Sequence, residues 1–159
     1  LEVQKTAPQP AACVFEPDQP IPSIALATLP GSQHRLGLQM VNSFFARGGW
    51  DCFMLESKSE IDLLGEIHRL SPDVVGLSVA SEKDISRVAR FIQRLRDIKL
   101  KQTPLVMLGG PALVAFPELA DQAKADLLVG DADLAVEKAV SMLRSRLNQN
   151  GPSKTITNS

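Results

Sequence analysis

The stretch SIALATLPGSQHRLGLQMVNSFFARGGWDCFMLE, residues 23–56, decides the fold. It opens with an apolar run at 23–29, turns at Pro30-Gly31, continues as a helical pattern at 34–49 and closes with a second apolar run at 50–56. A strand, a helix and a second strand in this order predict a β-α-β unit. The residues at three-to-four spacing that we expect on the buried face of the helix are Gly37, Val41, Phe44, Phe45 and Gly48.

The same alternation continues toward the end of the chain. Three more apolar runs lie at 73–79, 104–110 and 125–129. Further helical patterns lie at 59–70, 84–97, about 112–120 and 131–147. Strands alternating with helices predict an α/β domain, and near-continuous apolar strands indicate a parallel sheet covered by helices on both faces. We expect a flavodoxin-like (Rossmann-type) doubly wound sheet of five parallel strands, in the order 2-1-3-4-5.

Length and composition limit the class of protein. The chain has 159 residues, 44% of them hydrophobic, which suits one well-cored domain. A formal net charge of -1 gives no argument for direct nucleic-acid binding. No apolar run reaches the roughly 18 residues that a membrane span needs. Because Cys13 and Cys52 form neither a disulfide framework nor a CxxC pair, we expect a cytoplasmic setting.

The two ends of the chain differ from its middle. Residues 1–22 hold five of the eleven prolines and lack both an initiating Met and a signal-peptide core. We therefore expect a Pro-rich linker or extended N-terminal segment at 1–22, and a fragment of a longer protein. The polar sequence NQNGPSKTITNS at 148–159 predicts a disordered tail. The folded domain is expected over 23–147.

The loops that follow the predicted strands are rich in small residues. In doubly wound sheets, ligands bind at the carboxyl ends of the strands beside the topological switch point. The segments at these ends are PGSQH (30–34), SVASEKD (78–84), GGPA (109–112) and GDAD (130–133). Small residues there leave a slot, and glycine allows a ligand to approach the backbone. The sequence therefore predicts a binding slot at this edge.

His34 is expected at the mouth of this slot, in the first turn of a helix. The partial positive charge of a helix N-terminus favours a neutral imidazole, which can bind a metal. One histidine cannot hold a bare metal ion, so the metal would have to arrive inside a macrocycle. The alternative interpretation is a polar helix-start residue that makes one hydrogen bond.

Three of these segments resemble a known family. SQHRLG (32–37), LSVAS (77–81) and LGGPA (108–112) are similar to the cobalamin-binding domain that methyltransferases, mutases and light-sensing regulators share. Its pattern is Asp/Glu-x-His-x-x-Gly, then a serine motif, then Gly-Gly. Ser78 stands 41 positions after Gly37, and KADLLVGDADLAVEKA at 124–139 resembles the family's closing strand, turn and helix.

The resemblance implies cobalamin bound with its own base displaced, a mode called base-off, His-on. His34 would be the lower axial ligand to cobalt, or to iron if the cofactor is heme. The tail of the cofactor would enter the slot. The cofactor-binding residues that the resemblance implies are Ser32, His34, Gly37, Ser78, Val79, Gly109, Gly110 and Gly130.

Ser32 departs from the family pattern, which has an acid at this position. That acid accepts the ring N–H and raises the basicity of the imidazole; serine accepts the bond without a charge. The departure favours the sensory tetrapyrrole-binding domains of photosynthesis-gene antirepressors of the AerR/PpaA type and related light and redox regulators. PGSQHRLGLQMVNSFFARGGW (30–50) resembles their histidine segment more closely than that of the enzymes.

The expected function is therefore a cobalamin-binding sensory domain of a light- or redox-responsive transcriptional regulator, with no catalysis of its own. Its partner would be a transcription factor or another domain of the same protein. Two alternatives remain: a heme-binding sensor of the same fold, and a corrinoid-carrier domain of a methyltransferase or mutase. A phosphoreceiver is disfavoured, because Leu29-Pro30-Gly31 and Leu77-Ser78 stand where its acids are needed.

Overall fold

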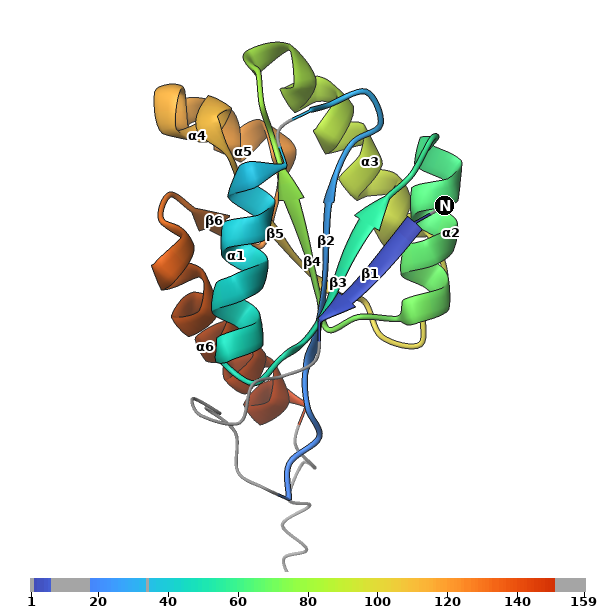
Figure 1. Cartoon of the computed structure of the whole chain (residues 1–159), viewed down its shortest axis with the longest axis vertical. Coiled ribbons are helices and arrows are strands. Elements are labelled where there is room, and N and C mark those ends of the chain that lie inside the picture. Colours follow the sequence, from blue (N-terminus) through green and yellow to red (C-terminus); the bar gives the residue numbers. More distant parts are fainter. Residues whose placement is uncertain (1, 7–17, 34, 151–159) are drawn as a thin grey trace, which may run out of the picture.

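A single sheet of six strands organises the chain in the computed structural model, which describes residues 2–6, 18–33 and 35–150 (Figure 1). The strand order across the sheet is β1-β3-β2-β4-β5-β6. The strands are β1 (Glu2–Thr6), β2 (Ser23–Thr28), β3 (Asp51–Glu56), β4 (Val74–Ser78), β5 (Leu105–Gly109) and β6 (Leu127–Val129).

The strands from β2 to β6 are parallel, as the sequence predicted. β2 pairs with β3 on one side and with β4 on the other, and the ladder continues through β5 to β6. Counted from β2, this is the order 2-1-3-4-5. The chain thus reverses its winding direction between β2 and β4, which places the topological switch point beside the end of β2.

The prediction of a sheet with only five strands was wrong at one edge. β1, which lies in the segment expected to be a linker or extended, pairs antiparallel with β3, with Glu2 opposite Glu56 and Thr6 opposite Cys52. Its sequence EVQKT is short and polar, because an edge strand needs little apolar surface and charge protects it from unwanted pairing. Hydrophobic patterning therefore gives no signal for it.

Helices cover both faces of the sheet (Figure 1). Residues of α1 and α6 share one hydrophobic cluster with one face, and residues of α2, α3, α4 and α5 share another with the opposite face. The helices are α1 (Leu36–Arg47), α2 (Glu60–Leu70), α3 (Ile85–Asp97), α4 (Pro111–Ala115), α5 (Ala120–Ala123) and α6 (Ala132–Gln149), with short 3-10 turns η2 (Glu82–Asp84) and η3 (Pro117–Leu119).

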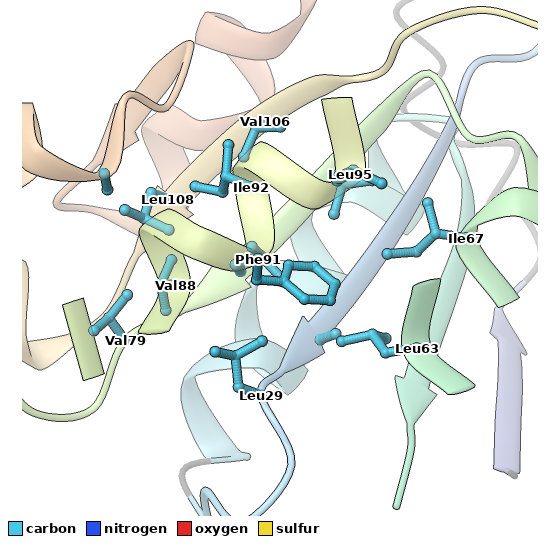
Figure 2. Packing of buried hydrophobic residues seen from close by; sticks show 14 of the residues in the cluster. Leu29, Leu63, Ile67, Val79, Val88, Phe91, Ile92, Leu95, Val106 and Leu108 are labelled. Atoms are coloured by element: carbon cyan, nitrogen blue, oxygen red, sulfur yellow. The ribbon is translucent and has the colours of Figure 1, made fainter. Parts of the chain in front are cut away.

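The second cluster is built around α3. Phe91 and its neighbours on this helix pack against strand residues such as Val106 and Leu108, and against Leu63 of α2 (Figure 2). Leu29, directly after β2, belongs to the same cluster. On the other face, the rings of Phe45 and Trp50 meet edge to face with centroids 4.9 Å apart.

The buried face of α1 differs from the expected one. Leu38, Asn42, Phe45 and Ala46 are its buried residues, whereas Gly37 is exposed. Phe45 and Gly48 are buried as predicted. The helix is rotated because Leu38 packs in the cluster with the sheet, and this rotation turns the side of α1 that carries Gly37 away from the core. None of the helices in the described ranges is long and apolar enough to cross a membrane.

Candidate functional site

A slot of about 380 Å³ opens at the carboxyl ends of the parallel strands, between α1 and the start of α6. Its floor is formed by side chains of Leu26 and Met107 with Gly76 between them. The α1 residues that line it are Gly37, Leu38, Met40 and Val41. The residues that line it from the strand ends and the turns after them are Leu77, Ser78, Gly109, Gly110, Pro111, Val114, Val129, Gly130, Asp131 and Ala132.

Two glycines keep the walls of the slot open. A Cβ added at Gly37 or at Gly130 would meet no atom within 4 Å, so these two positions face open space. The floor is different, because a Cβ at Gly76 would lie 2.6 Å from Cδ2 of Leu26 and 3.0 Å from Cε of Met107. Glycine therefore lets the floor pack closely while the walls remain apart.

Gly110 has the strongest requirement for glycine in the slot. Its φ of 114° and ψ of 168° lie in a region that side chains rarely allow. A Cβ here would lie 2.5 Å from the carbonyl oxygen of Val79, 2.7 Å from its nitrogen and 2.9 Å from Oγ of Ser78. The turn after β5 is thus pressed against the end of β4, which keeps the Ser78 hydroxyl beside the slot.

Val79 acts through its backbone rather than its side chain. It is fully buried, and its N–H donates to the carbonyl oxygen of Gly109 at 2.8 Å. Its own carbonyl oxygen accepts from the N–H of Ala112 at 3.2 Å. Val79 therefore joins β4 to the start of α4 without lining the slot itself.

The structure brings together five of the eight residues expected to bind the cofactor. Gly37, Ser78, Gly109, Gly110 and Gly130 all line the slot. The remaining three are Ser32, His34 and Val79. Sequence reasoning missed the floor, although a glycine inside the apolar run DVVGLSV (73–79) signals close packing at that point.

Ser32 lies outside the slot. It lines a separate cavity of about 140 Å³ that Arg35, Glu56 and Ser57 also border. The Ser32 hydroxyl is buried and has no hydrogen-bond partner among the described residues. The expected axial ligand, His34, lies outside the described residues.

The chemistry of the slot is mainly apolar. Among the described residues that line it, Asp131 is the only one with a charge. The mouth is bordered by the exposed apolar side chains of Met40 (59% exposed) and Val114 (66% exposed). Within the described ranges, no group of three or more His, Cys, Asp or Glu side chains could hold a metal ion. The slot suits a largely uncharged organic group.

Comparison with known proteins decides the family. A family model described as a B12 binding domain matches residues 22–140, most of the chain. The chain belongs to the B12-binding domain family. This assignment confirms cobalamin as the expected cofactor and favours it over the heme alternative. No curated protein sequence matches the chain significantly.

Solved structures with the same fold include cobalamin proteins. The chain is similar to a cobalamin-binding protein from Desulfitobacterium hafniense, with a TM-score of 0.67 and 20% identity over 76% of this chain and 58% of that one. It is also similar to the monomethylamine corrinoid protein of Methanosarcina barkeri, with a TM-score of 0.61 and 18% identity over 76% of this chain and 57% of that one. The chain thus spans less than three fifths of either neighbour.

The fold by itself is shared more widely. The C-terminal part of E. coli RcsC, which contains a phosphoreceiver domain, aligns with a TM-score of 0.57 and 15% identity over 91% of this chain and 54% of that one. The residues of the slot, rather than the sheet order, therefore have to support any functional argument.

The slot residues of this B12-binding domain fit the cofactor that the family binds. The fit rests on the open positions at Gly37 and Gly130, on the close approach at Gly110 and on the apolar floor. A nucleotide tail needs a narrow space with few charges and a hydroxyl for its polar edge, and Ser78 is the hydroxyl beside this space.

Proposed function

We propose that this domain binds cobalamin in the base-off, His-on form, with His34 as the lower axial ligand and the nucleotide tail in the slot between α1 and α6. The observation that carries the proposal is the meeting of Gly37, Ser78 and the glycines at 109, 110 and 130 around one slot. These residues come from four separate segments of a chain that belongs to the B12-binding family. When bound, cobalamin supplies a cobalt–carbon bond that can be broken by light or by reaction.

The chain's own residues have distinct parts in this proposal. Ser78 donates or accepts a hydrogen bond at the polar edge of the tail, and the glycines leave room for its plane. Leu26 and Met107 exclude water from the floor. The exposed apolar side chains of Met40 and Val114 border the mouth, where the periphery of a macrocycle would meet them.

The regulatory role rests on Ser32. An acid at this position would hold the imidazole of the axial histidine in one orientation and increase its basicity. Serine supplies no charge, so we expect a weaker axial bond that exchanges more easily. Such a bond suits a sensor of the AerR/PpaA type, in which light or redox state changes the ligation and thereby a contact with a transcription factor or a neighbouring domain.

A corrinoid-carrier domain is the second candidate function. The similarity in fold to the monomethylamine corrinoid protein supports it. In that case cobalt would carry the reacting group, and this domain would hold the cofactor in place for a separate catalytic domain. The two functions share the slot and differ in the consequence of a change in the axial bond, which is a new surface contact in a sensor and a transferred group in a carrier.

Cofactor binding can be tested by absorption spectroscopy. The protein is incubated separately with hydroxocobalamin, adenosylcobalamin and hemin, then desalted, and the retained bands are recorded. We expect cobalamin to be retained with a His-on spectrum. His34→Ala should lose that spectrum, whereas His68→Ala, which changes an exposed histidine on α2, should keep it. Failure to retain any cobalamin would contradict the proposed function.

Illumination separates the sensor from the carrier. Protein loaded with adenosylcobalamin is exposed to light, and its hydrogen exchange and hydrodynamic size are compared before and after. A sensor should change at the surface around the slot. Unchanged exchange and size would favour the carrier. Ser32→Asp should strengthen the axial bond in either case, seen as a larger His-on fraction in the spectrum.

A further inference from the structure

A hydrogen-bonded relay connects two helices to the turn that precedes His34. Arg87 of α3 donates from Nη1 to the carbonyl oxygen of Pro30 at 2.8 Å. Its Nε donates to Oε1 of Glu60, in the first turn of α2, at 2.6 Å. One guanidinium therefore ties α2 and α3 to the backbone just after β2.

The turn that receives this contact is tightly shaped. The N–H of Ser32 donates to the carbonyl oxygen of Leu29 at 3.1 Å, and Gly31 has a φ of 91°. Leu29 is buried in the same cluster as Phe91 of α3 and Leu63 of α2 (Figure 2). The apolar side of α3 thus packs over the end of β2, while Arg87 reaches the carbonyl of the next residue.

The far end of the turn is held by a different contact. Arg35, directly after His34, pairs with Glu56 at the end of β3. Both side chains of that pair are about half exposed, at 54% and 50%, whereas Arg87 and Glu60 are 34% and 22% exposed. Because solvent and salt screen the exposed pair more strongly, the contact of Arg87 is the firmer anchor.

We propose that Arg87 is a positioning residue for the axial histidine, acting through the carbonyl of Pro30 and held in place by Glu60. This inference rests on the proposed function of His34. With serine at position 32, no carboxylate is available there to orient the ring. The backbone that carries the histidine must therefore be fixed by other means, and Arg87 supplies a charged donor at that backbone.

A neighbouring arginine gives a matched control. Arg94, two turns further along α3, also reaches Glu60, with Nη1 3.4 Å from Oε2. The hydrogen bond from this helix to the carbonyl of Pro30 comes from Arg87. Arg94→Gln therefore removes a positive charge and a contact to Glu60 from the same helix, while the bond from Arg87 to Pro30 is kept.

The test compares Arg87→Gln with Arg94→Gln by two measurements on the whole chain. The first is the affinity for hydroxocobalamin, followed by absorbance. The second is the EPR spectrum of bound cob(II)alamin, in which a coordinated imidazole nitrogen splits the cobalt signal. We expect Arg87→Gln to weaken binding roughly tenfold, the effect of losing one charged hydrogen bond, and to reduce the nitrogen splitting. Arg94→Gln should change neither by more than about twofold.

Urea denaturation shows whether each variant is folded. If Arg87→Gln does not fold, Arg87→Lys replaces it, because lysine keeps the charge but cannot span Pro30 and Glu60 with a planar fork. We then expect a smaller loss of nitrogen splitting. Equal splitting and affinity in the Arg87 and Arg94 variants would overturn the positioning role alone. Absence of nitrogen splitting in the unchanged chain would overturn the proposed axial histidine itself.

Discussion

Gly110→Ala should destabilise the folded domain strongly. Alanine would have to adopt a φ of 114° and a ψ of 168°, a conformation that costs about 1–3 kcal/mol. Its Cβ would also lie 2.5 Å and 2.7 Å from the backbone oxygen and nitrogen of Val79. Backbone atoms cannot rotate aside, so relief of this overlap adds about 1–3 kcal/mol. Together we expect a loss of about 3 kcal/mol or more.

The measurement is urea denaturation followed by fluorescence. Trp50 is the only tryptophan and is fully buried, so its emission reports the loss of the core. Gly130→Ala is the control, because its Cβ meets nothing within 4 Å and the residue lines the same slot. It should change the free energy of unfolding by less than about 1 kcal/mol. A Gly110→Ala loss of equally small size would refute the reasoning.

Three further predictions concern other parts of the fold. Burial, with a smaller contribution from the charge of Asp51, raises the pKa of Cys52 from 9.0 to about 12. Since only the unfolded thiol ionises in that interval, the free energy of unfolding should fall between about pH 9 and pH 12, and less steeply in Cys52→Ala, by urea denaturation at each pH. Ser59→Ala removes the N-cap of α2 and should cost about 1 kcal/mol by the same assay. Thr6→Val removes the acceptor of the 3.1 Å bond from Asn42 and should cost about 1–3 kcal/mol, with faster hydrogen exchange in β1.

Most of the fold could be predicted because its signals are local. The runs SIALATL and DVVGLSV are apolar along their whole length, which only a strand covered on both faces requires, and they correspond to β2 and β4. β1 could not be predicted in the same way. Its pairing depends on the exposed backbone of β3, and backbone hydrogen-bonding groups leave no trace in a pattern of side chains.

The candidate site was predictable as a set of positions and less so as a geometry. Glycines at the ends of strands signal open space, and five of the expected residues line the slot. Ser32 was expected beside them but borders the smaller cavity. Periodicity placed Gly37 on the buried face of α1, whereas the packing of Leu38 determines the rotation of that helix. Such a rotation depends on contacts between elements, which a helical period does not contain.

The slot has walls from distant parts of the chain, from Leu26 near the beginning of the sheet to Ala132 in the first turn of α6. During synthesis, a growing chain therefore has a floor and one wall long before it has the second. No nascent fragment that lacks α6 can enclose a ligand in this slot. Capture of a cofactor must follow completion of the domain, so the cofactor stabilises the finished fold and cannot guide its early assembly.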